Sequence, residues 1–244
     1  MSNSHIQAIE ALAAGSAIRA YSWKNRGRSP LGYVQGMALA YARIYCKLAQ
    51  NDPAALEMAK AQTADASRDA LAHYAPEFQA LGMSNSNAGA DTLRHLFVLL
   101  IGLGMRESSG RHCEGRDMAA QNVQAETCET GLFQFSYNSR TASPLLPRLI
   151  QSYAGRRDFL SPFRRGVACD SDSWANHGTG PGAEFQQLAK QCPAFAVEYG
   201  AVLLRNRRRH FGPINTKKAE LRREADALFQ DVRAYVEANG VTAI

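Results

Sequence analysis

The stretch LFVLLIGLGMRESSG, residues Leu96–Gly110, decides the fold of this chain. It begins with ten residues, Leu96–Met105, that are all apolar or glycine. A helix that crosses a bilayer needs about 20 such residues, so this segment predicts a buried core helix and no membrane span. We expect the helix to run from about Leu93 to Arg106, capped by Asp91 or Thr92. Because it is apolar on nearly every face, it belongs at the centre of the fold.

Helical spacing of apolar residues continues on both sides of this segment. It predicts a helix of about 20 residues through Leu31–Leu48, and Asp52 with Pro53 starts the next one. Further helices are expected at 71–81, 144–155, 182–191, 193–206 and 216–238, with a loop over 161–182. Residues 131–138 (GLFQFSYN) predict either a strand or a tight turn into a helix. The expected fold is mostly α, a single helical domain with a short strand or turn segment and a polar loop. It comprises N-terminal helices (1–90), a helix–loop–GLFQ core (91–140) and C-terminal helices (141–244).

The charge of the chain is unevenly distributed. Its 244 residues carry a net charge of +6. The basic residues concentrate in 1–50, in 140–166 and in the run 205–210 (RNRRRH). A positive surface attracts polyanions such as an acidic cell-wall polymer, although it is also compatible with a solvated face that binds nothing. No nucleic-acid-binding module accompanies the charge, so we do not expect nucleic acid as a partner.

The five cysteines leave the redox state open. They are Cys46, Cys113, Cys128, Cys169 and Cys192, and no pair has the CxxC spacing of a zinc cluster. Two disulfides, 113–128 and 169–192, would suit an exported protein, whereas five reduced thiols would suit a cytosolic one. We favour the two disulfides. There is also no HExxH, P-loop or dinucleotide motif, so we expect no metal and no cofactor.

Glu107 is the residue best placed for chemistry. It stands where the apolar helix is predicted to end, and a carboxyl in such a place is partly desolvated. Desolvation raises its pKa, as a general acid that works near neutral pH requires. The structural alternative is a surface glutamate paired with Arg106 or Arg111.

Two short motifs resemble those of the lysozyme superfamily. Arg106-Glu107-Ser108 is followed, 24 positions after the glutamate, by Gly131-Leu132-Phe133-Gln134. Goose-type lysozymes and soluble lytic transglycosylases are the most similar members, and the resemblance covers about Leu96 to Ser139. The whole-chain pattern, including 194–199 (AFAVEY) and 210–215 (HFGPIN), also resembles uncharacterised bacterial proteins of this kind. The later Ala-Tyr-Asn-type motif of the family is not cleanly present; Tyr199 or the loop 174–178 (WANHG) would replace it.

The resemblance implies cleavage of a glycosidic bond, with Glu107 protonating the leaving oxygen. A second carboxylate would stabilise the oxocarbenium-like transition state or activate water. Glu129 is the first choice and Glu126 the next, with Asp117 also a candidate. Lytic transglycosylases, however, use a single glutamate. Four residues would contact the sugar or orient the acid, with Tyr199 a possible fifth: Ser108, Gln134, Tyr137 and Asn138.

We therefore expect a lysozyme-like glycoside hydrolase or lytic transglycosylase that acts on peptidoglycan. One alternative is the same fold acting on chitosan or another polysaccharide, and a second is a non-catalytic protein that binds polyanions or cell wall. The substrate implies a location outside the cytoplasm, periplasmic or secreted, although the N-terminus shows no signal-peptide pattern. Retaining, inverting and transglycosylase outcomes, and the oligomeric state, stay open.

Overall fold

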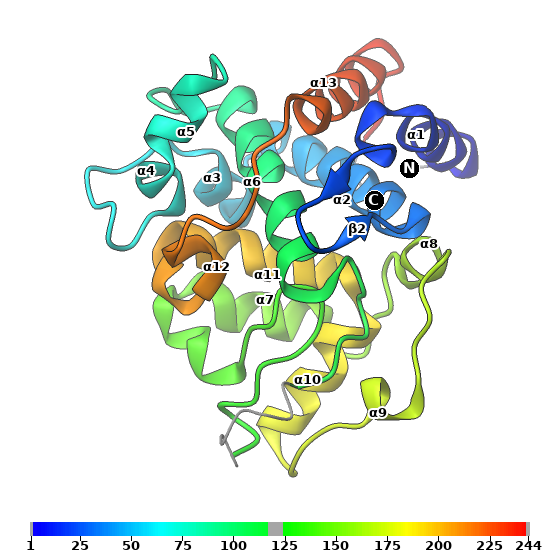
Figure 1. Cartoon of the computed structure of the whole chain (residues 1–244), viewed down its shortest axis with the longest axis vertical. Helices are drawn as coiled ribbons and strands as arrows, with labels where there is room; N and C mark the ends of the chain where they lie inside the picture. The colour runs from blue at the N-terminus through cyan, green and yellow to red at the C-terminus, as the bar shows by residue number, and fades with distance from the viewer. Residues whose placement is uncertain (1, 117–123, 243–244) are drawn as a thin grey trace.

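Helix α6 (Ala90–Ser108) runs through the middle of the molecule in the computed structural model, which describes residues 2–116 and 124–242 (Figure 1). From Leu96 to Met105 every residue of it is buried. The predicted central helix is therefore confirmed, and it is longer than expected at both ends. The predicted cap is wrong, because the capping position is Gly89, whose φ of 131° suits glycine. Asp91 and Thr92 lie inside the first turn.

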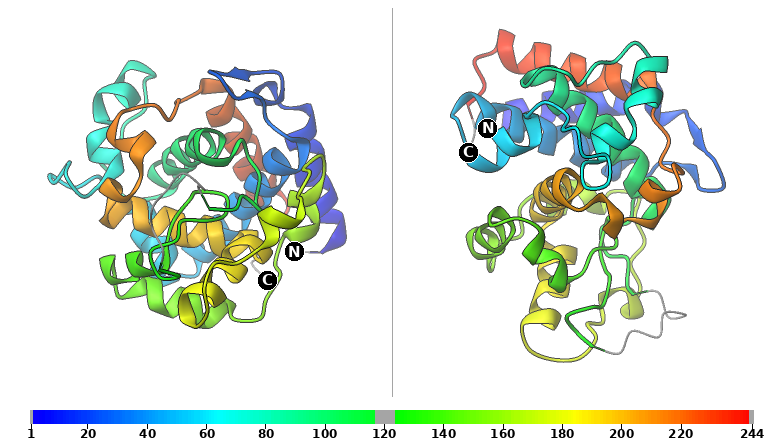
Figure 2. Two further views of the ribbon diagram at one scale, coloured as in Figure 1. Left: turned by 60° about the horizontal axis from the view of Figure 1, so that its bottom comes forward. Right: turned by 90° about the vertical axis from the view of Figure 1, so that its left-hand side faces the viewer.

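Two other largely buried helices pack against α6. They are α2 (Leu31–Ala49), which confirms the helix predicted over Leu31–Leu48, and α11 (Pro193–Asn206). The remaining helices surround these three, with α13 at one end of the molecule and α10 at the other (Figure 2). They are α1 (Asn3–Gly15), α3 (Pro53–Ala59), α4 (Ala70–His73), α5 (Ala75–Ala80), α7 (Leu145–Tyr153), α8 (Leu160–Arg164), α9 (Ser171–Trp174), α10 (Pro181–Gln191), α12 (Gly212–Asn215) and α13 (Arg223–Ala238).

Short segments depart from the predicted helices. The helix expected over 71–81 is split into α4 and α5, because Pro76 cannot donate the backbone hydrogen bond of a helix interior and stands instead in the first turn of α5. The helix expected from 216 begins only at Arg223. Lys217 has a left-handed φ of 51°, so the backbone is not helical at this position, and the helix begins after it. The predicted loop over 161–182 contains most of α8 and all of α9.

The segment 131–138 forms a tight turn, the second of the two predicted alternatives. A single antiparallel bridge joins Thr130 to Phe135, and a 3-10 helix (Tyr137–Ala142) follows. The sheet of the described residues is instead a small hairpin near the N-terminus, where β1 (Ser22–Trp23) pairs antiparallel with β2 (Gly27–Arg28). In Figure 1 this hairpin lies beside the lower end of α6.

The expected disulfide pairs are wrong. Cys113 is bonded to Cys169, with their Cα atoms 6.1 Å apart, and the other three cysteines are free and buried. The bond joins residues 56 positions apart, which the folded chain brings together and sequence spacing does not indicate. Among the described residues, no helix combines the length and the apolar character that a membrane crossing requires, as expected.

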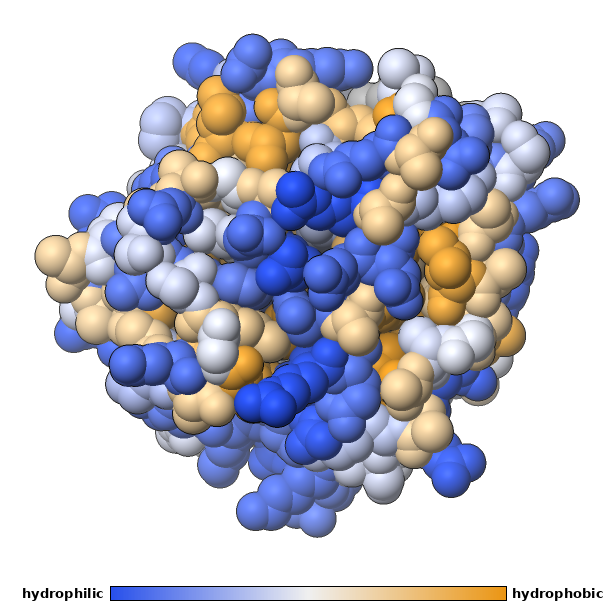
Figure 3. All heavy atoms as spheres, turned by 90° about the horizontal axis from the view of Figure 1, so that it is seen from above, coloured by the Kyte–Doolittle hydropathy of each residue, from blue (hydrophilic) through white to orange (hydrophobic). Residues whose placement is uncertain are grey.

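Polar surface is not confined to one end of the molecule. Figure 3 looks onto the face formed by the upper elements of Figure 1, among them α5 and α13. A strip of strongly hydrophilic side chains crosses this face between more hydrophobic areas (Figure 3). A polar surface alone therefore does not locate a functional site in this protein.

Candidate functional site at the end of helix α6

Glu107 lies in the last turn of α6, half-buried, as its place in the sequence predicts. The helix ends at Ser109, which adopts the left-handed conformation with φ 55°. Packing against Tyr33 holds this end of the helix in place. A Cβ on Gly104 would come within 2.3 Å of the Tyr33 hydroxyl oxygen, and one on Gly110 within 2.7 Å of its ring. Both glycines are therefore required for the helix to approach Tyr33 this closely.

Burial raises the pKa of Glu107 to about 8. The negative charge of Glu129 acts in the same direction, whereas the positive charges of Arg26 and Arg106 lower the pKa. Within the described residues, the Glu107 carboxyl makes no hydrogen bond and no ion pair that would offset its desolvation. The carboxyl therefore holds its proton at neutral pH and is able to donate it. The alternative of a surface pair with Arg111 does not apply, because Arg111 pairs with Glu114.

Glu129 is the acidic neighbour of Glu107, as the sequence predicts. Its side chain is 46% exposed, and its Oε1 lies 3.9 Å from Nε2 of His210. Burial lowers the pKa of His210 to about 4, so the imidazole is neutral at pH 7 and forms no charged pair with Glu129. Glu126 is not among the groups that shift the pKa of Glu107; its backbone oxygen accepts a hydrogen bond from the amide of Asn138. Asp117 lies outside the described residues.

The turn 131–134 is attached to the end of α6 by Ser108. The buried Ser108 hydroxyl is 2.9 Å from the backbone oxygen of Leu132 and 3.0 Å from that of Gly104. It therefore positions the turn against the helix, which is a different role from the predicted orientation of Glu107 or contact with sugar. Gln134 donates its side-chain NH₂ to the backbone oxygens of Gly115 and Gly131. This amide also holds the turn.

The remaining predicted sugar contacts are divided between surface and core. Asn138 is exposed, and its Oδ1 accepts a hydrogen bond from Ser136. Tyr137 is half-buried, and the guanidinium of Arg140 lies 3.9 Å from the centre of its ring. Tyr199 is completely buried, and its hydroxyl is hydrogen-bonded to that of Ser139. It therefore packs in the core and does not reach a ligand at the surface.

Tyr137 also lines a cavity of about 430 Å³. The cavity lies between α7 and α10 and is bordered by Arg156, Arg157 and Phe185. Glu107 is not among the residues that line it. Tyr137 and Glu107 therefore do not line this cavity together.

Sequence reasoning missed one residue that acts on Glu107, Arg26, and one that lies beside Glu129, His210. Arg26 is exposed at the turn of the hairpin, 81 positions before Glu107, and His210 follows α11. His210 belongs to the segment 210–215 that the resemblance includes, but no spacing rule connects it to Glu129. Both reach the site only through the packing of distant segments.

The basic run 205–209 is not one surface. Arg205 is completely buried in a salt bridge with Asp69, and Arg208 donates to the side chain of Asn215. Arg207 and Arg209 are exposed and border a small hollow near Thr141. The expectation of a continuous solvated face is therefore wrong for Arg205, because its planar group finds a full set of partners inside the protein.

No family model matches this chain, and comparisons with curated proteins and with solved structures likewise find no match. The assignment of function therefore depends on the residues around Glu107 and on the two short motifs. The structure itself shows a mostly helical chain whose central helix ends in a half-buried carboxyl. Burial raises the pKa of this carboxyl to about 8, so it is protonated at neutral pH.

Proposed function

We propose that the protein is a glycan-cleaving enzyme, a lysozyme-like glycoside hydrolase or lytic transglycosylase, in which Glu107 is the general acid. The observation that carries the proposal is the half-buried carboxyl of Glu107 at the end of α6, where burial raises its pKa to about 8. A glycosidic oxygen is a poor leaving group unless it is protonated as the bond breaks. An acid with a pKa near or above the working pH supplies that proton.

Glu129 supplies negative charge on the same site. Its side chain is 46% exposed, and its charge raises the pKa of Glu107. In a hydrolase, such a carboxylate would stabilise the positive charge that develops on the sugar or would activate water. In a lytic transglycosylase, an acetylmuramic substituent attacks instead, and Glu129 would only tune Glu107. The proposal holds in both cases, and the products distinguish them.

Peptidoglycan is the substrate class that we favour. The net charge of +6 favours association with an anionic wall polymer and disfavours cationic chitosan. The short motifs around Glu107 and Gly131 agree with this choice. A substrate of this kind lies outside the cytoplasm, so the protein would act in the periplasm or outside the cell.

The test is product analysis by mass spectrometry after incubation with peptidoglycan, chitosan and a neutral β-glucan. We expect the unaltered protein to cut peptidoglycan, with anhydro ends for a transglycosylase or reducing ends for a hydrolase. Glu107→Gln should lower the rate at least about 100-fold, because it removes general acid catalysis. Asp231→Asn, on the exposed side of α13, is the matched control and should cut normally.

Three other outcomes would reject all or part of the proposal. Cleavage of chitosan or β-glucan alone would keep Glu107 and replace the substrate. Equal cleavage by Glu107→Gln would remove Glu107 from the mechanism. If none of the polymers is cut but peptidoglycan is bound, and the binding is lost in Arg207→Ala/Arg209→Ala, the protein is a non-catalytic binder that uses its exposed arginines.

A further inference from the structure

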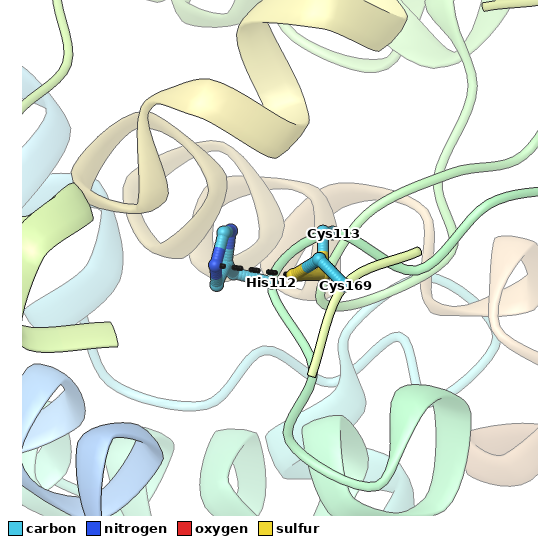
Figure 4. A group of neighbouring side chains, drawn as sticks. All are labelled: His112, Cys113 and Cys169. Carbon is cyan, nitrogen blue, oxygen red and sulfur yellow. Dashed lines mark hydrogen bonds between the residues drawn. A yellow bond between two sulfur atoms is a disulfide. The ribbon is translucent and has the colours of Figure 1, made fainter. Parts of the chain in front are cut away.

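Three potential metal ligands meet beside the loop that leads away from Glu107. They are His112, Cys113 and Cys169, and their ligand atoms all lie within 4.8 Å of one another (Figure 4). His112 and Cys113 are fully buried, whereas Cys169 is half-buried. The sulfur atoms form the disulfide, and the imidazole of His112 points its Nε2 at Cys169 Sγ, 3.8 Å away (Figure 4).

The tautomer of His112 is set by its other nitrogen. Nδ1 lies 2.9 Å from the backbone oxygen of Lys190, which only accepts hydrogen bonds. Nδ1 therefore carries the proton, and the lone pair of Nε2 is directed at the sulfur atoms. Metal-bound histidines are held in the same way, since their second nitrogen almost always donates to a carbonyl, a carboxylate or water.

The surroundings of the cluster do not depend on the disulfide. The ammonium group of Lys190 donates to the backbone oxygens of Ser173, Trp174 and Ala175, at 2.8–3.0 Å. These contacts hold the segment after Cys169 against α10. The ring of Trp174 also packs on the imidazole of His112, with 5.6 Å between the ring centres. If the disulfide is reduced, both sides of the cluster therefore keep separate attachments to the rest of the fold.

The dimensions suit a tetrahedral ion. With Zn–S distances of about 2.3 Å and Zn–N distances of about 2.0 Å, two sulfurs lie roughly 3.8 Å apart and the nitrogen lies roughly 3.6 Å from each. The separation of His112 Nε2 from Cys169 Sγ is already 3.8 Å. The two sulfurs would have to separate by less than about 2 Å, and Cys113 Sγ, which lies within 4.8 Å of Nε2, would move with rotation of its side chain.

We propose that the reduced protein binds one Zn²⁺ through His112 Nε2 and the thiolates of Cys113 and Cys169. A dithiol reductant would give two electrons to the S–S bond, becoming a disulfide itself and leaving two protein thiols. Zn²⁺ then displaces the two thiol protons, and water occupies the fourth position. Sulfur and imidazole ligands select Zn²⁺ over Mg²⁺ and Ca²⁺, which prefer oxygen. The disulfide and the zinc ion are thus alternative cross-links of the same two segments.

The cross-link would matter for the loop beside Glu107. The backbone oxygen of Glu114, next to Cys113, accepts hydrogen bonds from the amide of Gly131 and the hydroxyl of Thr130. The segment that carries the cysteine therefore supports the turn that packs against α6. Zinc would preserve this support where a reductant removes the disulfide. This inference does not depend on whether Glu107 is catalytic.

The test uses the full chain, reduced with a water-soluble phosphine and titrated with Co²⁺ without oxygen. We expect one equivalent of Co²⁺ to produce thiolate-to-cobalt charge-transfer absorption, which Zn²⁺ then removes, and the oxidised protein to show none. Cys169→Ala should weaken Co²⁺ binding by at least about 100-fold, more than the loss of an outer-shell contact. Cys128→Ala is the control, because Cys128 is free and outside the cluster, and should bind as the parent does.

A second measurement needs no substitution, so it remains informative if a variant fails to fold. Zn²⁺ should protect Cys113 and Cys169 of the reduced protein from alkylation, as mapped by peptide mass spectrometry, and leave the alkylation of Cys46 unchanged. The proposal is overturned if the reduced protein gives no charge-transfer band. Equal Co²⁺ affinity in Cys169→Ala, or alkylation of the pair that ignores Zn²⁺, would also overturn it.

Discussion

The ends of helices α11 and α6 each carry an ionisable residue that the fold removes wholly or partly from water, and the surroundings of the two residues differ. Arg205, in the last turn of α11, is 2% exposed. Its guanidinium forms two hydrogen bonds to the carboxylate of Asp69, at 2.9 and 3.0 Å. It donates three more to backbone oxygens: those of Met58, Lys60 and Ala61. Every N–H of the group has a partner, and the charge is balanced.

Glu107, at the end of α6, receives no such set of partners in the described residues. Its closest acidic neighbour, Glu129, carries the same charge and raises its pKa further. Desolvation is costly in both regions, but only in the first is it offset by opposite charge and hydrogen bonds. The comparison separates a structural charge from a reactive one. A group that is buried and fully satisfied stabilises the fold, and one that is buried and left uncompensated changes its protonation state instead.

The largest effect is expected at Arg205. Arg205→Met should lower the free energy of unfolding by about 3–5 kcal/mol, because it leaves the Asp69 carboxylate and three backbone oxygens buried without their donor. Urea denaturation measures this. Arg207→Met, on an exposed neighbour, should change stability by less than about 0.5 kcal/mol. If the two variants lose the same free energy of unfolding, the buried contacts of Arg205 do not stabilise the fold more than those of an exposed arginine.

Glu107→Gln should do the opposite and stabilise the protein at neutral pH. The pKa of Glu107 is about 8 in the folded chain, against an ordinary value of 4.5 for a solvated glutamate. The contribution of the Glu107 carboxyl to the free energy of unfolding is therefore fully present below pH 4.5, and it is lost as the pH rises through 8. Glutamine does not titrate, so the variant and the parent should agree near pH 4.

Above pH 8, the variant should be more stable on the order of 1–2 kcal/mol, about 2–8 °C in Tm. This magnitude allows for the water that still reaches a half-buried group. Thermal unfolding across this pH range is the measurement, and Asp231→Asn should show no difference that depends on pH. If the difference in Tm between Glu107→Gln and the parent does not increase between pH 4 and pH 8, Glu107 is solvated like a surface carboxyl.

The smallest effect concerns the neighbours of Glu107. Glu129→Gln removes a like charge and should lower the pKa of Glu107, whereas Arg26→Gln removes a favourable charge and should raise it. Each shift should be less than about one unit, since both side chains are exposed and water screens them. NMR titration of ¹³C-labelled glutamate measures both. Lys24→Gln makes the same charge change in the same hairpin and should leave the pKa unchanged; shifts of the same sign in the first two variants would refute this account.

The same shifts should appear in catalysis. If Glu107 acts as a general acid, kcat/KM falls as the pH rises through its pKa in the free enzyme, near 8. The pH at which kcat/KM falls should be lower in Glu129→Gln and higher in Arg26→Gln. If this pH does not follow the pKa measured by NMR, the titration belongs to another group.

Local patterns determined the parts of this protein that depend on near neighbours. The central helix, its nearly complete burial and the place of Glu107 at its end follow from the apolar run Leu96–Met105, because a helix that is apolar all round has to be enclosed. The helix over 31–48 follows from periodicity in the same way. The raised pKa of Glu107 was one of two alternatives that this place at the helix end offered, and burial in the folded chain decided between them.

Only the tertiary structure decided which distant residues meet. Cys113 is bonded to Cys169 rather than to Cys128, Arg205 is buried while Arg207 is exposed, and Arg26 and His210 reach the neighbourhood of Glu107 and Glu129. Such pairings depend on how helices pack around one another, and packing is a property of surfaces assembled from the whole chain. Residues that look alike in a run, such as the arginines of 205–209, are therefore separated into core and surface only when the chain folds.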